Sequence, residues 1–250
     1  MHLRPLLSAA LALCLITPAL AEQDLRRIRI TTYEMASHLL TYNNPNLKSS
    51  LSNHGEYRSA YSEKLNELEL MTMRLADPRL SLHFTDIQRR ISALETFGSA
   101  DCDRLASWIN PILEAHAELD MTAAAAEEEK ADGQSLVSDI LLRIAQINFY
   151  YQLRTFSTLS VPPLRDVTDP IATLDTEILD SFAEAERRFS ACSAALVSSL
   201  KDYRFVRPGL LDNRSAWIHE SVNRYTSSIS SKLSPMLTGT CHSTKSVSAR

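Results

Sequence analysis

The segment PIATLDTEILDSFAEAERRFSACSAALVSSLKDY, residues 170–203, carries the strongest signal for the fold class. Apolar or small residues recur in it every seven positions, at Ile171, Ile178, Ala185 and Cys192. A second series is interleaved with the first, at Phe182, Phe189, Leu196 and Tyr203. Sustained heptads of this kind favour long helices that pack side by side. We therefore expect one continuous helix over 170–203, which begins at the capping pair Asp169-Pro170.

The same helical spacing extends over most of the chain. Apolar residues follow steps of three and four around 57–75 and 80–94, which places them on one face of a helix. Only five glycines occur in 250 residues, which is few for a protein rich in β-turns. The sequence predicts an all-α fold, an elongated bundle of about six to seven helices. The expected helices are 24–42, 54–75, 78–98, 101–131, 134–157, 170–203 and 209–236. We assign 22–250 to a single domain with a frayed tail at 238–250.

The two tryptophans lie in similar segments, DRLASWIN (103–110) and DNRSAWIH (212–219). Each segment follows a helix with an Asp-Pro start, at Asp77-Pro78 and at Asp169-Pro170. This common order suggests two related helical hairpins, although the unequal spacing of the features weighs against a true repeat. We interpret Trp108 and Trp217 as packing anchors, and a pair of ligand-stacking side chains is the alternative.

The first 21 residues, MHLRPLLSAALALCLITPALA, have the order of a secretory signal peptide. Arg4 precedes a short apolar run, and Ala19-Leu20-Ala21 supplies the small residues that signal peptidase requires. Lipidation at Cys14 is the alternative, which the bulky Leu13 disfavours. The apolar run is shorter than the ~20 residues of a membrane span. We expect cleavage after Ala21, a periplasmic or secreted location, and no transmembrane segment in the mature chain.

The cysteines point to one disulfide, because an exported chain meets an oxidising compartment. Loss of Cys14 leaves Cys102, Cys192 and Cys241. If the two Asp-Pro helices run parallel, Cys102 and Cys192 lie at similar heights, roughly 33–36 Å from the helix starts. We therefore predict a Cys102–Cys192 disulfide, with Cys192 as an ordinary small core residue as the alternative. Cys241 would be free, paired with another chain, or paired with Cys102.

The sequence contains no recognisable catalytic motif. Its histidines are scattered, and it has no H-E-x-x-H, G-x-S-x-G or C-x-x-C motif and no clustered glycines. We expect no enzyme activity, no metal site and no cofactor. The formal net charge of −4 argues against a nucleic-acid partner, which requires a basic face.

Long amphipathic helices without a catalytic motif favour a function in protein–protein binding. We expect the partner to be another envelope or secreted protein. The alternative is a ligand-binding or sensor-type bundle that uses a polar stripe on the expected 134–157 helix. That stripe has steps of 4, 3, 4 and 4 and consists of Asp139, Arg143, Gln146, Tyr150 and Arg154. Its arginines suit an anionic or carboxylate ligand. The competing interpretation is a solvated face with an Asp139–Arg143 pair.

Overall fold

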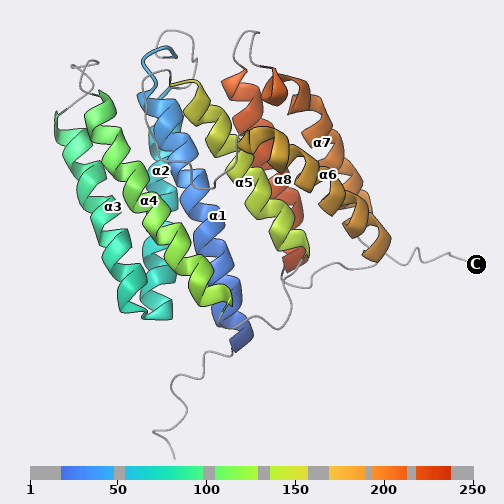
Figure 1. Ribbon diagram of the computed structural model, residues 1–250, viewed down its shortest axis with the longest axis horizontal. Coiled ribbons are helices and arrows are strands. Elements are labelled where there is room, and N and C mark those ends of the chain that lie inside the picture. Colours follow the sequence, from blue (N-terminus) through green and yellow to red (C-terminus); the bar gives the residue numbers. More distant parts are fainter. Residues whose placement is uncertain are drawn as a thin grey trace, which may run out of the picture.

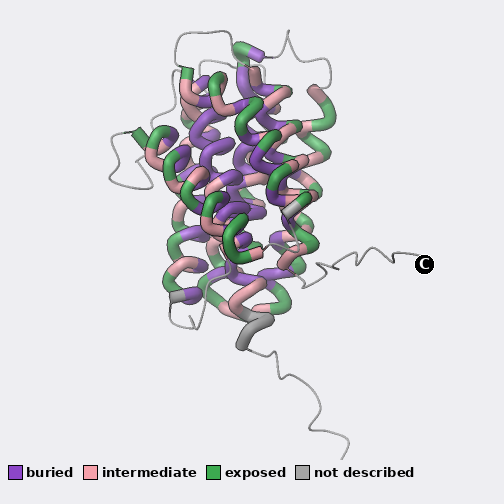
Figure 2. The backbone as a smooth tube through the Cα atoms, turned by 90° about the vertical axis from the view of Figure 1, so that its right-hand side faces the viewer, coloured by how far each residue is buried: buried purple, intermediate pink, exposed green. Residues whose placement is uncertain are grey.

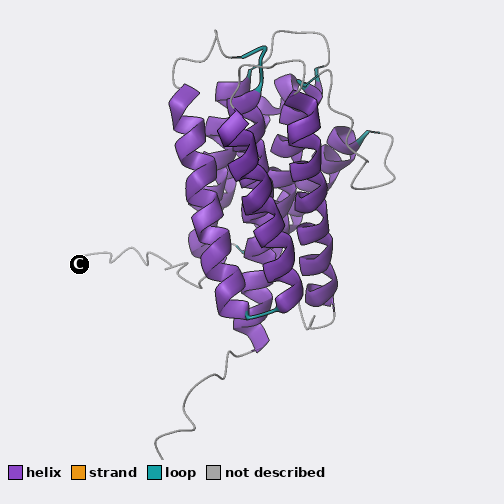
Figure 3. Ribbon diagram, turned by 90° about the vertical axis from the view of Figure 1, so that its left-hand side faces the viewer, coloured by secondary structure: helices purple, strands orange, loops and turns teal. Residues whose placement is uncertain are grey.

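The computed structural model describes residues 18–47, 54–97, 105–128, 136–156, 169–189, 193–212 and 218–237. All regular structure in these ranges is helical, as Figures 1 and 3 show. The eight helices are α1 (Pro18–Asn43), α2 (His54–Leu75), α3 (Pro78–Phe97), α4 (Leu105–Glu128), α5 (Leu136–Arg154), α6 (Pro170–Arg188), α7 (Ser193–Leu211) and α8 (His219–Leu237). The all-α prediction is confirmed, but the described part of the chain forms eight helices rather than six to seven.

The additional helix arises because the segment 170–203 is not one helix. Helix α6 ends at Arg188, and its C-cap Phe189 leaves the helical region with φ −115° and ψ 57°. Helix α7 begins at Ser193 and continues to Leu211, past the expected end at 203. The heptad residues of both helices are nevertheless buried in the same core. They are Ile171, Ile178, Phe182, Ala185, Leu196 and Tyr203. A heptad records which residues face a neighbour, and a helical hairpin satisfies it as well as a single long helix does.

The eight helices form two rings of four. Helix α1 packs against α2 and α4, and α3 completes the first ring; α5 packs against α6 and α8, and α7 completes the second. Successive helices run in opposite directions, and the two rings meet along α1 and α5 (Figure 1). Helix α5 is central, since 14 of its 19 residues are buried. Figure 2 shows the buried residues concentrated on the inward sides of the helices.

Both Asp-Pro pairs start helices as predicted. The Asp169 carboxylate accepts hydrogen bonds from the backbone N–H groups of Ile171 and Ala172, each at 3.1 Å. The Asp77 carboxylate accepts one from the N–H of Arg79 at 2.8 Å. These bonds satisfy donors that the first turn of a helix leaves unpaired.

The two Asp-Pro helices nevertheless hold different places in the rings. Helix α3 is the third helix of its ring, whereas α6 is the second, and α7 separates α6 from the second tryptophan segment. The predicted pair of hairpins therefore does not match the observed helix order. Trp108 lies in the first turn of α4 and packs, partly buried, against the core. Trp217 and the three cysteines of the predicted mature chain, Cys102, Cys192 and Cys241, lie outside the described residues.

Candidate functional site

The polar stripe on α5 is tied to several other helices. Asp139 lies 3.1 Å from Arg26 of α1, and Arg143 lies 2.9 Å from Glu177 of α6. The Asp139–Arg143 pair of a solvated face is thus replaced by pairs with two different helices. The ligand-binding role of the stripe stays a prediction, but its ionic partners within the chain come from α1 and α6, one helix of each ring.

The remaining side chains of the stripe are buried or hydrogen-bonded within the protein. Gln146 and Tyr150 are buried, with 3% and 8% of their surface exposed. Arg154 donates hydrogen bonds to the backbone carbonyls of Leu210 and Asp212, at 2.9 and 3.3 Å. A guanidinium at the carboxyl end of α7 compensates the partial negative charge of that helix end.

A buried charge network joins α1, α4 and α5. Arg29 lies 2.7 Å from Asp120 and 3.0 Å from Glu127. The Nε atom of Arg26 lies 2.5 Å from the same Glu127, without the geometry of a hydrogen bond. The run Glu127-Glu128-Glu129 is unexpected at a helix end that disfavours negative charge. Because Glu127 is buried between two arginines, its negative charge is compensated at this helix end.

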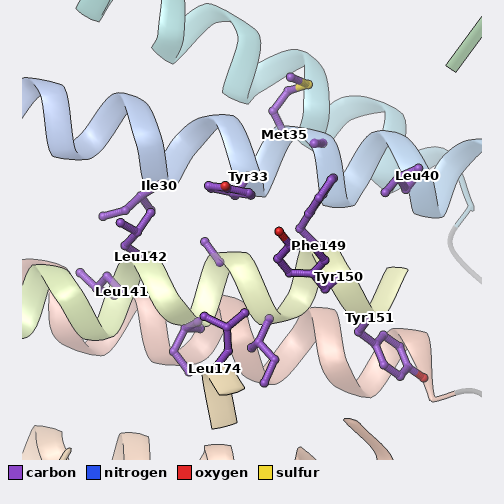
Figure 4. Packing of buried hydrophobic residues seen from close by; sticks show 14 of the residues in the cluster. Ile30, Tyr33, Met35, Leu40, Leu141, Leu142, Phe149, Tyr150, Tyr151 and Leu174 are labelled. Carbon is purple, nitrogen blue, oxygen red and sulfur yellow. The ribbon is translucent and has the colours of Figure 1, made fainter. Parts of the chain in front are cut away.

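His116 occupies the interior next to this network. Its ring stacks on Phe149 with centroids 5.0 Å apart and meets the edge of Tyr33 at 4.7 Å. Figure 4 shows Tyr33 of α1 and Phe149 of α5 at this seam. Neither nitrogen of His116 has a hydrogen-bond partner among the described residues. Burial lowers the pKa of His116 to about 4, so the ring is neutral at pH 7.

A candidate binding space is the groove over α1, between α2 and α8. We call it the α1 groove. It encloses about 570 Å³, which is within the range of small-molecule sites. Its walls are Gln23, Arg27, Ile30, Thr31, Glu34 and His38 of α1, Lys64 and Glu67 of α2, Leu141 of α5, and Ser227, Ser230, Ser231, Ser234, Pro235 and Leu237 of α8.

The two ends of the α1 groove differ in charge. At one end Arg27 is exposed and forms no ion pair within the described part of the chain. At the other end Lys64 lies 3.1 Å from Glu34 and 3.2 Å from Glu67. Two carboxylates against one ammonium leave that end with an excess negative charge.

Hydroxyl groups line the α8 side of the groove. Ser230 donates a hydrogen bond to Glu34 at 3.0 Å and so fixes the distance between α8 and α1. Ser227, Ser231 and Ser234 are exposed in the groove, and their oxygens can accept hydrogen bonds from a ligand. Apolar atoms of Ile30, Leu141 and Leu237 complete the lining; Figure 4 shows the first two of these at the α1–α5 seam.

His38 lines the negative end of the groove. Its Nδ1 atom is buried and has no hydrogen-bond partner among the described residues. Burial lowers the pKa of His38, although the nearby Glu34 opposes this effect. A neutral imidazole at this position adds no positive charge to the end that holds Glu34 and Glu67.

A second feature lies where α2 turns into α3. Ala76 in this turn has a φ of 53°, a left-handed conformation that few non-glycine residues adopt. A pocket of about 410 Å³ lies beside it, lined by Leu25, Leu75, Asp77, Pro78, Arg79, Leu80 and Ala126. Large apolar side chains are exposed on the three helices that reach this end, at Leu70, Met73, Leu82 and Met121.

The sequence also contains a signal for the α1 groove, which the choice of the polar stripe on α5 overlooks. Gln23, Arg27, Ile30, Glu34 and His38 follow steps of 4, 3, 4 and 4, the same spacing as that stripe. From their spacing alone, the two stripes are equally good candidates for a binding site. Only the packing shows that the α5 stripe meets other helices while the α1 stripe borders open space.

Comparison with protein-family models, curated proteins and solved structures finds no match to this chain. Within the described ranges, none of the helices combines the length and apolar character that crossing a membrane would require. The same ranges hold no group of three or more His, Cys, Asp or Glu side chains arranged to bind a metal ion.

Proposed function

We propose that the chain is an exported binding protein that holds a small polar ligand in the α1 groove. The observation that supports this function is the groove itself, about 570 Å³ in volume, hydroxyl-lined and oppositely charged at its two ends. A site built on four helices of a packed bundle is largely formed before the ligand arrives, which limits the entropy cost of binding.

The test is a ligand screen by thermal unfolding of the purified chain. A compound that binds only the folded state raises the melting temperature as its concentration exceeds Kd. We expect at least one compound from a panel of amino acids, short peptides, carboxylates and sugars to do so. Export is tested by determining the amino-terminal residue of the protein recovered from the cell envelope, which we expect to be Glu22.

A blocking variant assigns any binding to the groove. Ser227→Trp places a large ring in the groove and should abolish the ligand-dependent rise in melting temperature. The matched control, Ser92→Trp, alters an exposed serine on α3, outside the groove, and should keep the full rise. Circular dichroism checks that both variants fold. A panel that raises no melting temperature, or a Ser227→Trp variant that still binds, would contradict the proposal.

A second candidate function, binding of another exported protein, rests on the apolar side chains near the α2–α3 turn. Leu70, Met73 and Leu82 are 63%, 70% and 67% exposed. Exposed apolar groups gathered at one end of a protein are typical of contact surfaces. The double variant Met73→Lys/Leu82→Lys should lose a partner that the unaltered chain captures from envelope extract. Equal recovery by both proteins would argue against this surface.

A further inference from the structure

The charges of the α1 groove restrict the class of ligand. Arg27 offers a guanidinium without an ion pair among the described residues at one end, and Glu34 and Glu67 share a single ammonium at the other. A ligand that is only anionic or only cationic would leave one end uncompensated. A zwitterion whose charges are well separated satisfies both ends at once.

The spacing of these groups fixes the length of such a zwitterion. Arg27 and Glu34 are seven residues apart on one helix, which corresponds to about 10 Å along α1. The two charges of a free amino acid lie much closer together. An extended chain spans about 3.4 Å per residue, so a peptide of three residues reaches about 10 Å between its ends.

The walls between the two ends match the middle of a peptide. Exposed hydroxyl oxygens of Ser231 and Ser234 can accept hydrogen bonds from peptide N–H groups. Pro235 is exposed in the groove and offers an apolar surface for one peptide side chain, whereas Ile30 and Leu141 are buried in its floor. A sugar would use the hydroxyls but neither charged end.

We infer that the α1 groove binds short peptides of about three residues with free ends. The peptide carboxylate meets Arg27, and the peptide ammonium meets Glu34 and Glu67. This inference rests on the proposed function and specifies its ligand.

Calorimetry on the full chain with the tripeptide Gly-Leu-Gly tests the inference. Blocking the amino end by acetylation or the carboxyl end by amidation should each weaken binding at least tenfold. Free leucine, with its two charges close together, should bind at least tenfold more weakly than the tripeptide. Equal affinity for the free and the blocked peptides would overturn the inference.

Two variants assign each end of the peptide. In Arg27→Gln, amidation should no longer weaken binding, while acetylation still should. In Glu34→Gln the pattern should be reversed. Arg204→Gln, an exposed arginine on α7 without an ion pair among the described residues, should behave like the unaltered chain. If amidation and acetylation weaken binding to both variants as they do to the unaltered chain, the assignment of the two ends is wrong.

The outcomes separate this inference from the proposed function. If no peptide binds but another compound raises the melting temperature and Ser227→Trp abolishes the rise, the groove is a ligand site and the peptide assignment is wrong. If no compound of any class binds, the proposed function fails as well.

Discussion

Asp175 and Arg207, 32 residues apart in the sequence, form a bidentate ion pair with N–O distances of 2.7 and 2.8 Å. In a single helix over 170–207 they would lie about 48 Å apart. The pair therefore exists only because the chain reverses between α6 and α7. The hydroxyl of Tyr203, which is fully buried, donates a hydrogen bond to the same carboxylate at 2.7 Å.

We predict that Asp175→Ala destabilises the protein by about 2 kcal/mol, because it leaves the buried Tyr203 hydroxyl without an acceptor. The loss stays moderate because Arg207 is partly exposed and regains water. Burial raises the pKa of Asp175, but hydrogen bonds from Arg207 and Tyr203 outweigh it and lower the pKa. The stabilisation is therefore complete above about pH 4 and is lost as the pH falls through the lower folded value. Urea unfolding at pH 7, with exposed Asp180→Ala as control, measures the effect.

The buried network around Glu127 gives a second prediction. Glu127→Gln should reduce the free energy of unfolding by about 3 kcal/mol, because Arg26 and Arg29 keep their charges in the interior and lose a counter-charge. Glu118→Gln, on the exposed side of α4, should change it by less than about 0.5 kcal/mol. Denaturant unfolding of the two variants measures the difference. Similar losses in both would show that the network contributes little.

His116 predicts a dependence of stability on pH. Its folded pKa, lowered by burial to about 4, lies below the unfolded value of about 6.5. The unfolded chain therefore binds a proton in this interval that the folded chain does not bind. The contribution of His116 to the free energy of unfolding is complete above about pH 6.5. Between pH 7 and pH 5 this residue alone lowers the free energy of unfolding by about 2 kcal/mol. In His116→Phe, which retains the ring contacts, the fall should be smaller by that amount.

His219 serves as the comparison for that experiment. Its pKa is also lowered by burial to about 4, so it adds a similar dependence in the same interval. The His116→Phe variant should keep this second contribution. Melting temperatures of the unaltered chain and the variant at pH 7 and pH 5 measure the difference. Equal changes with pH in both proteins would contradict the role of His116.

Gly209 marks a close approach between the end of α7 and the start of α8. A Cβ added there would clash with Cδ1 of Ile218. We predict that Gly209→Ala destabilises the protein by about 1 kcal/mol, because overpacking exceeds the gain in helix propensity. Adding Ile218→Ala to this variant should remove the clash, so the two effects should not be additive. Gly55→Ala, with no atom within 4 Å, should be neutral or stabilising. Thermal unfolding of the variants provides the test.

The candidate site could be predicted only in part. The sequence directed attention to Arg143 and Arg154, whose side chains the fold ties to Glu177 and to the end of α7. It contained an equally regular stripe around Arg27 and Glu34, but offered no reason to prefer it. A helical period shows that residues share a face. Whether that face meets a neighbouring helix or open space depends on contacts between segments far apart in the chain.

The helical class, most helix boundaries and the Asp-Pro starts could be predicted from the sequence alone, because they depend on local periodicity, capping and the backbone limits of proline. The hairpin over 170–203, the two rings of helices and the groove over α1 became evident only in the folded chain. Those features follow from pairs such as Asp175–Arg207 and Glu34–Ser230, which are separated by 32 and 196 residues. No local sequence pattern predicts such contacts, because the free energy of each contact is gained only when the two distant segments meet.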